Sequence, residues 1–523
     1  MTLQDHLAIL PVVLPLAAGA ITLIVDERRL GLKAAIGIGT MLLLVATGIA
    51  LTSIANTSHV TVYRVGDWPA PFGIVLVVDR LSAVMVLLAA VLGFASLVFS
   101  LARWDRAGPR FHSLVQFLLM GVNGAFLTGD LFNLFVFFEV LLAASYGLAL
   151  HGSGGARVRA GLHYITVNLA ASLLILVGVS LIYAATGTLN MADIARHWRE
   201  AWTGDRVLFE VGGAILGIAF LVKAGMWPLC FWLPGAYSAS SAPAAALFAV
   251  LTKVGVYAVL RTGTLFLGAD VAASPSPGTP WLVVAGMATL GFGALGVLAS
   301  QDLPRLASYC VLVSSGTLLA AVAIDNPALT GAALYYLVVS TLALSAFFLL
   351  VELVERGRGP GANMLAVTAE AFGADAGDEE EGAYVGAVIP AANALLGLSF
   401  VACALMLAGL PPLAGFVGKF AMLDALFARS PVPATSWTML VLLIGSGFAT
   451  LIGMGRAGVR RFWAASGAST PRVRVVEIAP IVVLLVLCAA LTVRAGGSMR
   501  YLNEAARALH APTGYITDVL GRR

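Results

Sequence analysis

Apolar runs long enough to cross a lipid bilayer recur along almost the whole chain. A helix needs roughly 20 apolar residues to span about 30 Å of hydrocarbon, and runs of this kind, separated by Pro, Gly and Arg, repeat through the 523 residues. Only 11% of the residues are charged, whereas soluble domains carry about 25%. The sequence therefore predicts an all-α integral membrane protein whose solvent is lipid, with no nucleic-acid partner.

The runs predict about fourteen transmembrane helices. They lie near 7–25, 32–50, 81–101, 114–127, 131–150, 162–185, 207–233, 242–267, 281–299, 306–324, 328–354, 389–427, 437–454 and 478–493. We divide the chain into helices 1–3 (1–105), helices 4–8 (106–267), helices 9–13 (280–455) and helix 14 with a C-terminal tail (474–523). Alternating β-branched residues near 59–79 predict an outer hairpin, and the acidic, Gly-rich stretch near 356–388 predicts a mobile loop.

Positive charge predicts the orientation of these helices, because short cytoplasmic loops collect Lys and Arg. Alternate loops are rich in Arg, beginning with the loop that holds Arg28, Arg29 and Lys33, while the opposite set, which includes Arg261, is poorer. Both termini are therefore expected outside. The N-terminus lacks the basic segment of a cleavable signal, so the first run is expected to remain as a span.

Two of the predicted helices are interrupted by proline. The seventh contains AGMWPLCFWLP, with Pro228 and Pro234, and the twelfth contains AGLPPLAG, with Pro411 and Pro412. Both copies match AGxxPL and lie five helices apart, so they are expected to cross the membrane in opposite directions. Inverted repeats with broken helices are typical of transporters, and the breaks mark the ion site.

Only four lysines occur in the chain, and three of them, Lys223, Lys253 and Lys419, lie inside apolar runs. Most loop cations are Arg, so these three positions are expected to need lysine itself. A desolvated lysine loses its proton, whereas arginine stays charged. A charge near the bilayer centre costs about 2.5 to 3.5 kcal/mol, which favours a functional role over snorkelling to an interface, the alternative considered chiefly for Lys253.

Glu139 is the acidic residue deepest in an apolar run, within DLFNLFVFFEVLLAASYGL. A carboxylate there needs a partner or a proton, and Lys223 is the predicted partner, either in a fixed ion pair or in a pair that opens and closes and so switches proton affinity. Asp79 and Arg80 stand at a span end and are interpreted as solvated anchors. Asp424, one turn beyond Lys419, is left open between anchor and site.

No cofactor or metal site is predicted. The four cysteines stand singly in apolar segments, without a partner at metal-ligand spacing. No histidine pair indicates haem ligation, and no glycine-rich nucleotide loop follows a strand. The protein is therefore expected to draw its energy from neither ATP nor a bound redox group.

Four motifs then resemble one known family. They are DLFNLFVFFEV with Glu139, KAGMWPLCFWLPGAYSASSAP with Lys223, LTKVGVYAVLR with Lys253 and GLPPLAGFVGKF with Lys419. Their wording and order resemble the antiporter-like proton-translocating family, which includes the A-type and D-type subunits of Mrp Na⁺/H⁺ antiporters and three large membrane subunits of respiratory complex I. The length and the FFEV and LTKVGVY wording are most similar to the D-type subunit of the Mrp complex.

The resemblance implies fourteen helices, inverted five-helix repeats at helices 4–8 and 9–13, and a bacterial plasma-membrane complex of several subunits. It implies Glu139 and Lys223 as a gating pair, Lys253 as the central relay and Lys419 as the exit group. The sequence departs from many relatives because the eleventh helix lacks His and Lys, and Cys230 and Tyr237 replace histidines. Water with Ser340, Thr341 or Ser345 would then bridge this gap.

The leading functional hypothesis is a secondary transporter subunit, not an enzyme. It would pass protons in a multisubunit antiporter for Na⁺ or another monovalent cation, driven by a proton gradient worth about 2.3 kcal/mol per charge per 100 mV. Two alternatives stay open: a proton-pumping membrane subunit of complex I or a membrane-bound hydrogenase, and a structural subunit that is silent in transport.

Overall fold

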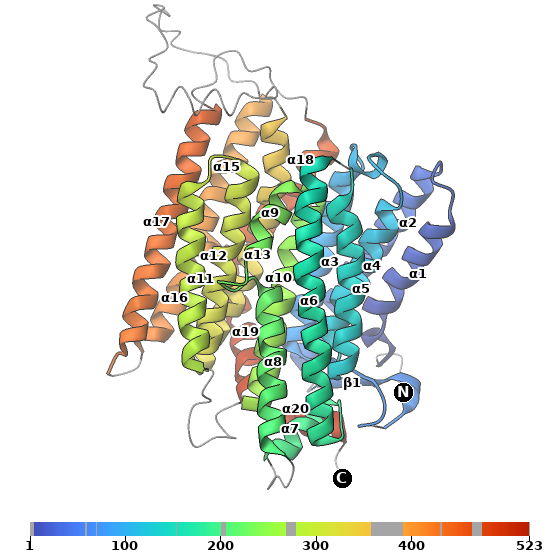
Figure 1. The fold of residues 1–523 in the computed structure, drawn as a ribbon. Coiled ribbons are helices and arrows are strands. Elements are labelled where there is room, and N and C mark those ends of the chain that lie inside the picture. The colour runs from blue at the N-terminus through green and yellow to red at the C-terminus, as the bar shows by residue number, and fades with distance from the viewer. Residues whose placement is uncertain are drawn as a thin grey trace, which may run out of the picture.

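The computed structural model describes residues 5–57, 60–69, 71–152, 154–199, 205–267, 279–356, 391–428, 431–462 and 473–521. This part of the chain is a bundle of long helices that run along one axis (Figure 1). Twelve of the described helices are long and apolar enough to cross a membrane, and two shorter apolar helices, Leu10–Ile24 and Phe111–Leu127, stand beside them. The predicted all-α membrane fold is confirmed, and the count of fourteen crossings stays a prediction.

The helices follow one another with short connections in the described part. Their bounds are α1 (Leu10–Ile24), α2 (Leu30–Thr57), α3 (Arg80–Ser100), α4 (Phe111–Leu127), α5 (Leu131–Leu150), α6 (Gly155–Thr186), α7 (Met191–Arg199), α8 (Arg206–Ala224), α9 (Trp232–Ala239), α10 (Ala242–Leu267), α11 (Thr279–Ala299), α12 (Leu303–Ala323), α13 (Pro327–Glu355), α15 (Ala391–Ala408), α16 (Ala414–Phe427), α17 (Ala434–Phe462), α18 (Val475–Val493), α19 (Ala495–His510) and α20 (Thr513–Leu520).

One small sheet interrupts the helices between α2 and α3. Strands β1 (Thr61–Arg64) and β2 (Val75–Val78) pair antiparallel, with Thr61 opposite Val78 and Arg64 opposite Val75. They lie within the stretch expected to form a hairpin, at the end of the bundle that holds both termini (Figure 1). The acidic, Gly-rich stretch near 356–388, expected to be mobile, lies beyond residue 356 outside the described residues.

The end of the bundle with the termini is covered by helices that the apolar runs did not predict. The short helices α7 and α20 lie there with the hairpin (Figure 1). The segment expected to be a C-terminal tail forms α19 and α20 instead. The reason is that α19 is amphipathic, with Leu502, Ala505, Ala506 and Leu509 buried at helical spacing, whereas only a continuous apolar run predicts a span.

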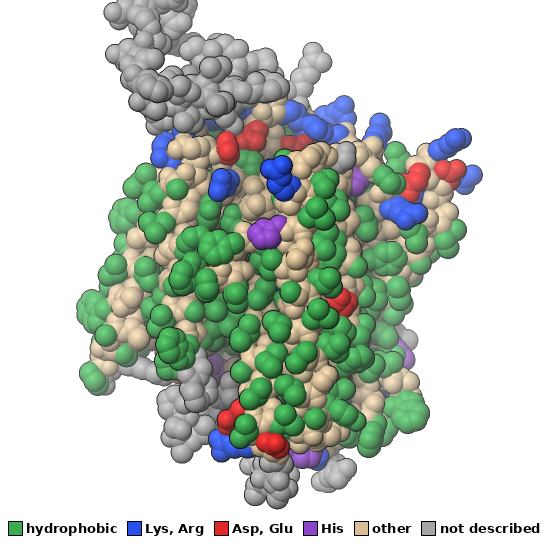
Figure 2. Space-filling view, in the orientation of Figure 1, with side chains coloured by type: hydrophobic (Ala, Val, Ile, Leu, Met, Phe, Trp, Pro, Cys, Tyr) green, Lys and Arg blue, Asp and Glu red, His purple; other side chains and the backbone are tan. Residues whose placement is uncertain are grey.

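Burial divides the bundle into an inner group and an outer ring. In the apolar windows of α10, α12 and α13, 94%, 89% and 89% of the residues are buried, against 39% or less in α2, α6, α11, α17 and α18. The outer helices present large apolar side chains, which cover the middle of the molecule in Figure 2. Only lipid makes such a face favourable, so α10, α12 and α13 are the core of the membrane domain.

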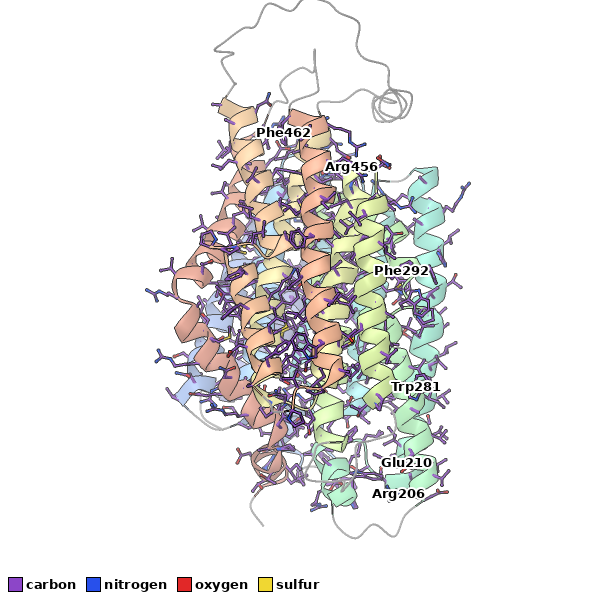
Figure 3. The ribbon with its side chains drawn as sticks, turned by 90° about the vertical axis from the view of Figure 1, so that its left-hand side faces the viewer. Arg206, Glu210, Trp281, Phe292, Arg456 and Phe462 are labelled. Carbon is purple, nitrogen blue, oxygen red and sulfur yellow. The ribbon has the colours of Figure 1, made fainter. Side chains whose placement is uncertain are left out.

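Charged side chains mark the two ends of the apolar zone. Arg206 and Glu210 form an ion pair of 2.9 Å at one end, and Arg456 at the other end donates to the Leu298 carbonyl at 2.6 Å, with Phe292 between the two levels (Figure 3). On the face shown in Figure 2, Lys and Arg gather chiefly at the end away from the termini.

Candidate functional site

The two predicted helix interruptions have the same backbone geometry. Gly225 follows α8 with φ +73° and Gly409 follows α15 with φ +77°, a left-handed conformation that glycine adopts without a Cβ penalty. Each is followed three residues later by a cis proline, Pro228 or Pro412. The prediction of two broken helices is confirmed.

The remaining two prolines of the breaks have different surroundings. Pro411 lies inside the second break, directly before Pro412. Pro234 lies in the first turn of α9, where a proline removes no intrahelical hydrogen bond. Pro234 therefore belongs to the helix that resumes after the first break, and Pro228 lies in the break itself.

Lys223 lies in the last turn of α8, directly before the first break, and its side chain is 4% exposed. Its Nζ donates to the Ser172 Oγ of α6 at 3.1 Å and lies 5.0 Å from the centroid of the Phe138 ring. An aromatic face attracts a cation at this distance. The ammonium is therefore held by one hydroxyl and one ring from two neighbouring helices.

Glu139 follows Phe138 on α5, and its Oε1 is buried without a hydrogen-bond partner. Among the described residues, no ion pair of 4.0 Å or less joins Glu139 to Lys223. In this conformation the predicted pair is open. Lys223 is hydrogen-bonded to Ser172, and Glu139 is the residue after Phe138, whose ring lies near the Lys223 ammonium.

Lys253 is fully buried on α10 and starts a chain of hydrogen bonds through the inner helices. Its Nζ donates to Ser314 Oγ of α12 at 2.9 Å, and Ser314 and Ser340 Oγ of α13 lie 3.0 Å apart. Snorkelling does not describe this lysine, because its ammonium ends inside the core. The chain joins the three most buried helices.

The three hydroxyls expected to bridge the eleventh predicted helix have different contacts. Ser340 belongs to the chain, but Thr341 donates to the Leu337 carbonyl of its own helix at 2.6 Å, and Ser345 Oγ is buried without a hydrogen-bond partner. Sequence reasoning missed Ser314. Its only signal was the pair Ser314 and Ser315 in an apolar run, and small polar residues there more often serve helix packing.

Lys419 lies on α16 just after the second break and is 6% exposed. Its Nζ donates to the Ala408 carbonyl, the last of α15, at 2.9 Å. The break frees this carbonyl from helical hydrogen bonding. A Cβ at Gly409 would lie 2.6 Å from Lys419 Cδ, so glycine also provides the space for the lysine. Asp424, the alternative site residue, is exposed.

A small cavity lies between the Lys253 chain and the helices that carry Lys419. It measures about 10 Å³, about the space of one water molecule. Ser314 and Ser340 line one side, and Met406, Gly415 and Thr450, from α15, α16 and α17, line the other. A water there would extend the Lys253 chain toward the second break.

Lys33, expected in a basic loop, lies instead in the first turn of α2 and is 1% exposed. Its Nζ lies 2.7 Å from Glu27 Oε1. The loop assignment is wrong for this residue, because Lys33 falls within the span predicted near 32–50 and belongs to that helix. All four lysines of the chain are therefore buried, whereas Arg28 and Arg29 beside Lys33 are exposed.

The site contains no obvious metal-ligand set. Within the described ranges, no three His, Cys, Asp or Glu side chains lie close enough together to hold a metal ion. All four cysteines are free and buried. The ionisable groups assigned to proton transfer by the sequence are the three core lysines and Glu139, and none of them belongs to such a cluster within the described ranges.

Known proteins resemble the chain over nearly its full length. Residues 128–449 match the transmembrane family described as NADH:quinone oxidoreductase/Mrp antiporter. A probable D subunit of a K⁺/H⁺ antiporter from Rhizobium meliloti is 55% identical over 99% of this chain and 98% of that protein. The D subunit of a Na⁺/H⁺ antiporter from Bacillus subtilis is 34% identical over 99% of this chain and 100% of its own length.

A solved structure resembles the whole fold. A chain of the Mrp complex from Dietzia sp. DQ12-45-1b superimposes with a TM-score of 0.83 at 26% identity, covering 100% of both chains. Family model, curated relatives and solved structure thus agree with the resemblance carried by the four lysine and glutamate motifs. The chain belongs to the NADH:quinone oxidoreductase/Mrp antiporter membrane-subunit family, in the group formed by the D-type Mrp subunits.

Proposed function

We propose that this chain is the proton-translocating subunit of a multisubunit monovalent cation/proton antiporter in a bacterial plasma membrane. The observation that carries the proposal is the buried chain Lys253–Ser314–Ser340, which joins the three innermost helices. A desolvated ammonium releases a proton far more readily than one in water, and serine hydroxyls both accept and donate. The chain of contacts thus has the groups that proton transfer requires.

The four ionisable groups have separate roles in this proposal. Lys223 and Glu139 form the gate, Lys253 is the central relay, and Lys419 is the exit group at the second break. A proton on Lys253 passes to the Ser314 and Ser340 hydroxyls and to water in the small cavity, and then to Lys419. The one-water cavity lined by Ser340 and Gly415 supports this route, because it joins the hydroxyl chain to the helices around the second break.

The open Glu139–Lys223 pair supports a gate rather than a fixed ion pair. A fixed pair would place the two charges in contact, whereas Lys223 is bonded to Ser172 here. When Lys223 moves to Glu139, the carboxylate stabilises the charged form of the lysine. When Lys223 returns to Ser172, this stabilisation is lost. The movement would therefore change how tightly Lys223 holds its proton.

The exchanged cation is proposed from the relatives' names. The relative at 55% identity is named as part of a probable K⁺/H⁺ antiporter and the one at 34% as part of a Na⁺/H⁺ antiporter. We therefore place K⁺ before Na⁺, which revises the emphasis of the sequence-based hypothesis. The partners are the other antiporter subunits. We expect both termini outside, and the Lys and Arg that gather at the opposite end of the face in Figure 2 support this orientation.

The test measures exchange by the whole complex in vesicles. Lys253→Met and Lys253→Arg are compared by the proton efflux that K⁺ or Na⁺ evokes, with Arg29→Gln, an exposed cation, as the control. Arginine keeps the charge but does not release its proton, so both Lys253 variants are expected to lose exchange at least tenfold while the control keeps it. Normal exchange in both Lys253 variants would show that the subunit is silent in transport.

The composition of the complex tests the energy source separately. Purification of the native assembly is expected to give only antiporter subunits. Quinone-reducing or hydrogenase subunits in stoichiometric amounts would instead assign this chain to a redox-linked pump.

A further inference from the structure

A second polar region lies at the end of the bundle that holds the termini, away from the break carbonyls and the small cavity. There a cavity of about 250 Å³ lies between the ends of α2, α3 and α10 and the helices α19 and α20. Its polar lining comprises Asn56, Thr57, Asp79, Arg80, Arg261, Thr264, Tyr515 and Asp518. We call it the terminal-face cavity. It is large enough for several water molecules, and its carboxylates and guanidinium groups favour them.

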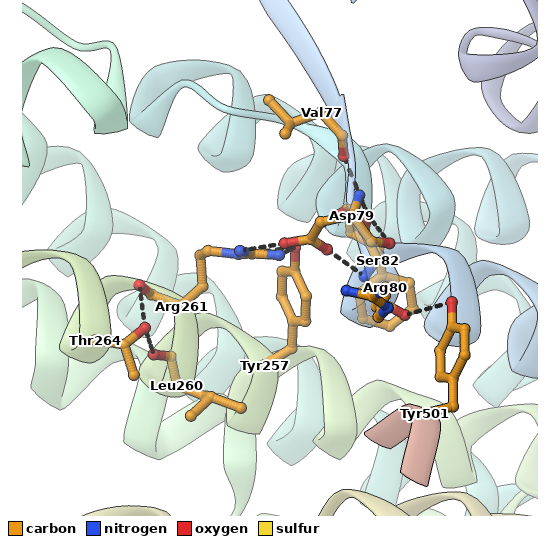
Figure 4. A network of polar contacts seen from close by, with 10 residues as sticks. Val77, Asp79, Arg80, Ser82, Tyr257, Leu260, Arg261, Thr264 and Tyr501 are labelled. Atoms are coloured by element: carbon orange, nitrogen blue, oxygen red, sulfur yellow. Dashed lines mark hydrogen bonds and ion pairs between the residues drawn. The ribbon is translucent and has the colours of Figure 1, made fainter. Parts of the chain in front are cut away.

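The inner wall of the terminal-face cavity is a buried ion pair. Arg261 Nη1 of α10 lies 2.6 Å from Asp79 Oδ2, with side chains 6% and 16% exposed. The solvated anchor expected at Asp79 is therefore wrong, and Arg261 is no loop residue. Asp79 also accepts from the Ser82 backbone at 2.8 Å, and Arg261 donates to the Tyr257 hydroxyl at 3.2 and 3.3 Å (Figure 4).

The rim of the same cavity carries a second, more exposed ion pair. Arg80 Nη2 lies 3.0 Å from Glu504 Oε2 and 3.2 Å from the Asn56 carbonyl, which ties α3 to α19 and α2. These side chains are 26% and 48% exposed. The two pairs differ in burial, so water reaches the rim pair more readily than the wall pair.

Arg261 of the Asp79–Arg261 pair, which we call the wall pair, lies on the same helix as Lys253, α10. Lys253, Tyr257 and Arg261 are spaced by four residues, which puts them on one face of the helix with about 12 Å between the first and the last. The Tyr257 hydroxyl donates to the Phe126 carbonyl at 2.6 Å. The terminal-face cavity and the central lysine are therefore connected along a single helix face.

An apolar layer separates the two in this conformation. A cavity of about 10 Å³ beside Tyr257 is lined otherwise by apolar side chains, including Met85, Leu260, Leu318 and Leu337. Small apolar cavities stay dry. Between the terminal-face cavity and Lys253, α10 thus carries first the Asp79–Arg261 pair and then this apolar layer, and Leu81 lines both cavities.

Resting on the function proposed above, we propose that the terminal-face cavity is the aqueous mouth of the Lys253 site and that the Asp79–Arg261 pair closes it. When the pair separates, the Asp79 carboxylate accepts a proton from water in the cavity. Water that enters the apolar layer carries this proton to the neutral Lys253 amine, while Arg261 stays charged throughout.

The cost of the pair favours such a role over a purely structural one. Apolar residues of similar volume often stabilise a protein as well as a buried ion pair does. Ionisable residues at membrane depth typically mark ion and proton pathways. Arg261 lies buried within the apolar helix α10, and its partner Asp79 stands half-buried at the start of α3, beside a polar cavity.

The charge state of Asp79 limits the ways in which the mouth can open. Burial by itself would raise the pKa of Asp79, but the Arg261 guanidinium and the hydrogen bonds from Ser82 outweigh it and hold the pKa below its usual range. With a depressed pKa, the pair contributes stability above the ordinary carboxyl range and loses it only as pH falls through the lower value. Between pH 5 and 8 the mouth therefore opens by conformational change, and external acid alone does not open it.

The test is labelling of single cysteines in the assembled complex. The four native cysteines are buried and are replaced first. Thr264→Cys then probes the cavity and Leu260→Cys the apolar layer, with Phe292→Cys on the lipid side as control. A membrane-impermeant, positively charged thiol reagent is applied to vesicles of either orientation. Thr264→Cys should react from the side of the termini only, and the other two at least tenfold more slowly.

Opening of the wall pair is then tested with a matched control on the rim. Asp79→Asn is expected to raise the labelling rate of Leu260→Cys tenfold or more, whereas Glu504→Gln, which breaks the rim pair, leaves it unchanged. Copurification of the other subunits checks assembly of each variant.

Two results would overturn the inference. One is a Thr264→Cys that is unreactive from the termini side or reactive from the other. The second is unchanged labelling of Leu260→Cys when Asp79 loses its charge. Labelling needs no transport, so a failure of the proposed function at Lys253 is distinguished from a failure of the mouth.

Discussion

The contact between Lys253 and Ser314 gives the sharpest quantitative prediction. Ser314→Ala removes the 2.9 Å acceptor of a fully buried ammonium. A hydrogen bond to a charged group contributes about 1.5 to 3 kcal/mol. Its loss affects the charged lysine and not the neutral one. At 1.36 kcal/mol per tenfold change, the protonated form of Lys253 becomes about 10 to 150 times less populated relative to the neutral form.

The expected result is a loss of cation-evoked proton exchange of about tenfold or more, because the central relay rarely holds a proton. Exchange is measured with a pH-sensitive dye in vesicles that contain the whole complex. Ser308→Ala is the matched control: the residue is buried on the same helix, but its hydroxyl donates to the Pro304 carbonyl at 2.8 Å, away from the lysine chain. It should keep most of the exchange.

Two outcomes would refute this reasoning. Exchange above half of the normal rate in Ser314→Ala would show that the lysine does not depend on this hydroxyl. Equal losses in the Ser314 and Ser308 variants would show that packing of α12 matters and the proton chain does not. Thermal stability should fall more in Ser314→Ala, which leaves the buried ammonium without its acceptor, than in Ser308→Ala, which removes a hydroxyl bonded within its own helix.

The other predictions concern the two flanking lysines. Gly409→Ala should lose exchange tenfold or more, because its Cβ would displace Lys419. Gly187→Ala, with φ +71° and open space around its Cβ, should lose only the roughly 1 to 2 kcal/mol of a left-handed alanine in thermal stability and keep exchange. Ser172→Ala removes the hydrogen-bond acceptor of Lys223 and should shift the pH of half-maximal exchange; an unchanged pH profile would argue against the proposed gate.

The sequence predicted the features that the membrane itself imposes. Span lengths follow from bilayer thickness, and a lysine in an apolar run is conspicuous because nothing local compensates its cost. Lys223, Lys253 and Lys419 were found in this way. The breaks were found because Gly followed within three residues by Pro prevents a continuous helix.

The contacts between distant helices were not predictable in the same way. Ser314 and Lys253 lie 61 positions apart, and Asp79 and Arg261 come from different helices far apart in the chain. Which face of one helix meets which face of another depends on packing of the whole bundle. A span of high apolar content all round has no polar stripe that reveals its rotation. Charge at a span end was interpreted as solvated for the same reason, although α19 and α20 cover that end.

Lysine and arginine have different roles in the proton-transfer site and in the terminal-face cavity. All four lysines are buried, and they are four of only 31 Lys and Arg residues. Arg261 is also buried, yet it has a carboxylate at 2.6 Å, whereas Lys253 has only a hydroxyl. A group that must stay charged needs a counter-charge in a medium of low dielectric, and a group that must lose its proton is better without one. On α10, the carboxylate partner therefore keeps Arg261 charged, so that it closes the mouth. The hydroxyl partner leaves Lys253 able to gain and lose its proton.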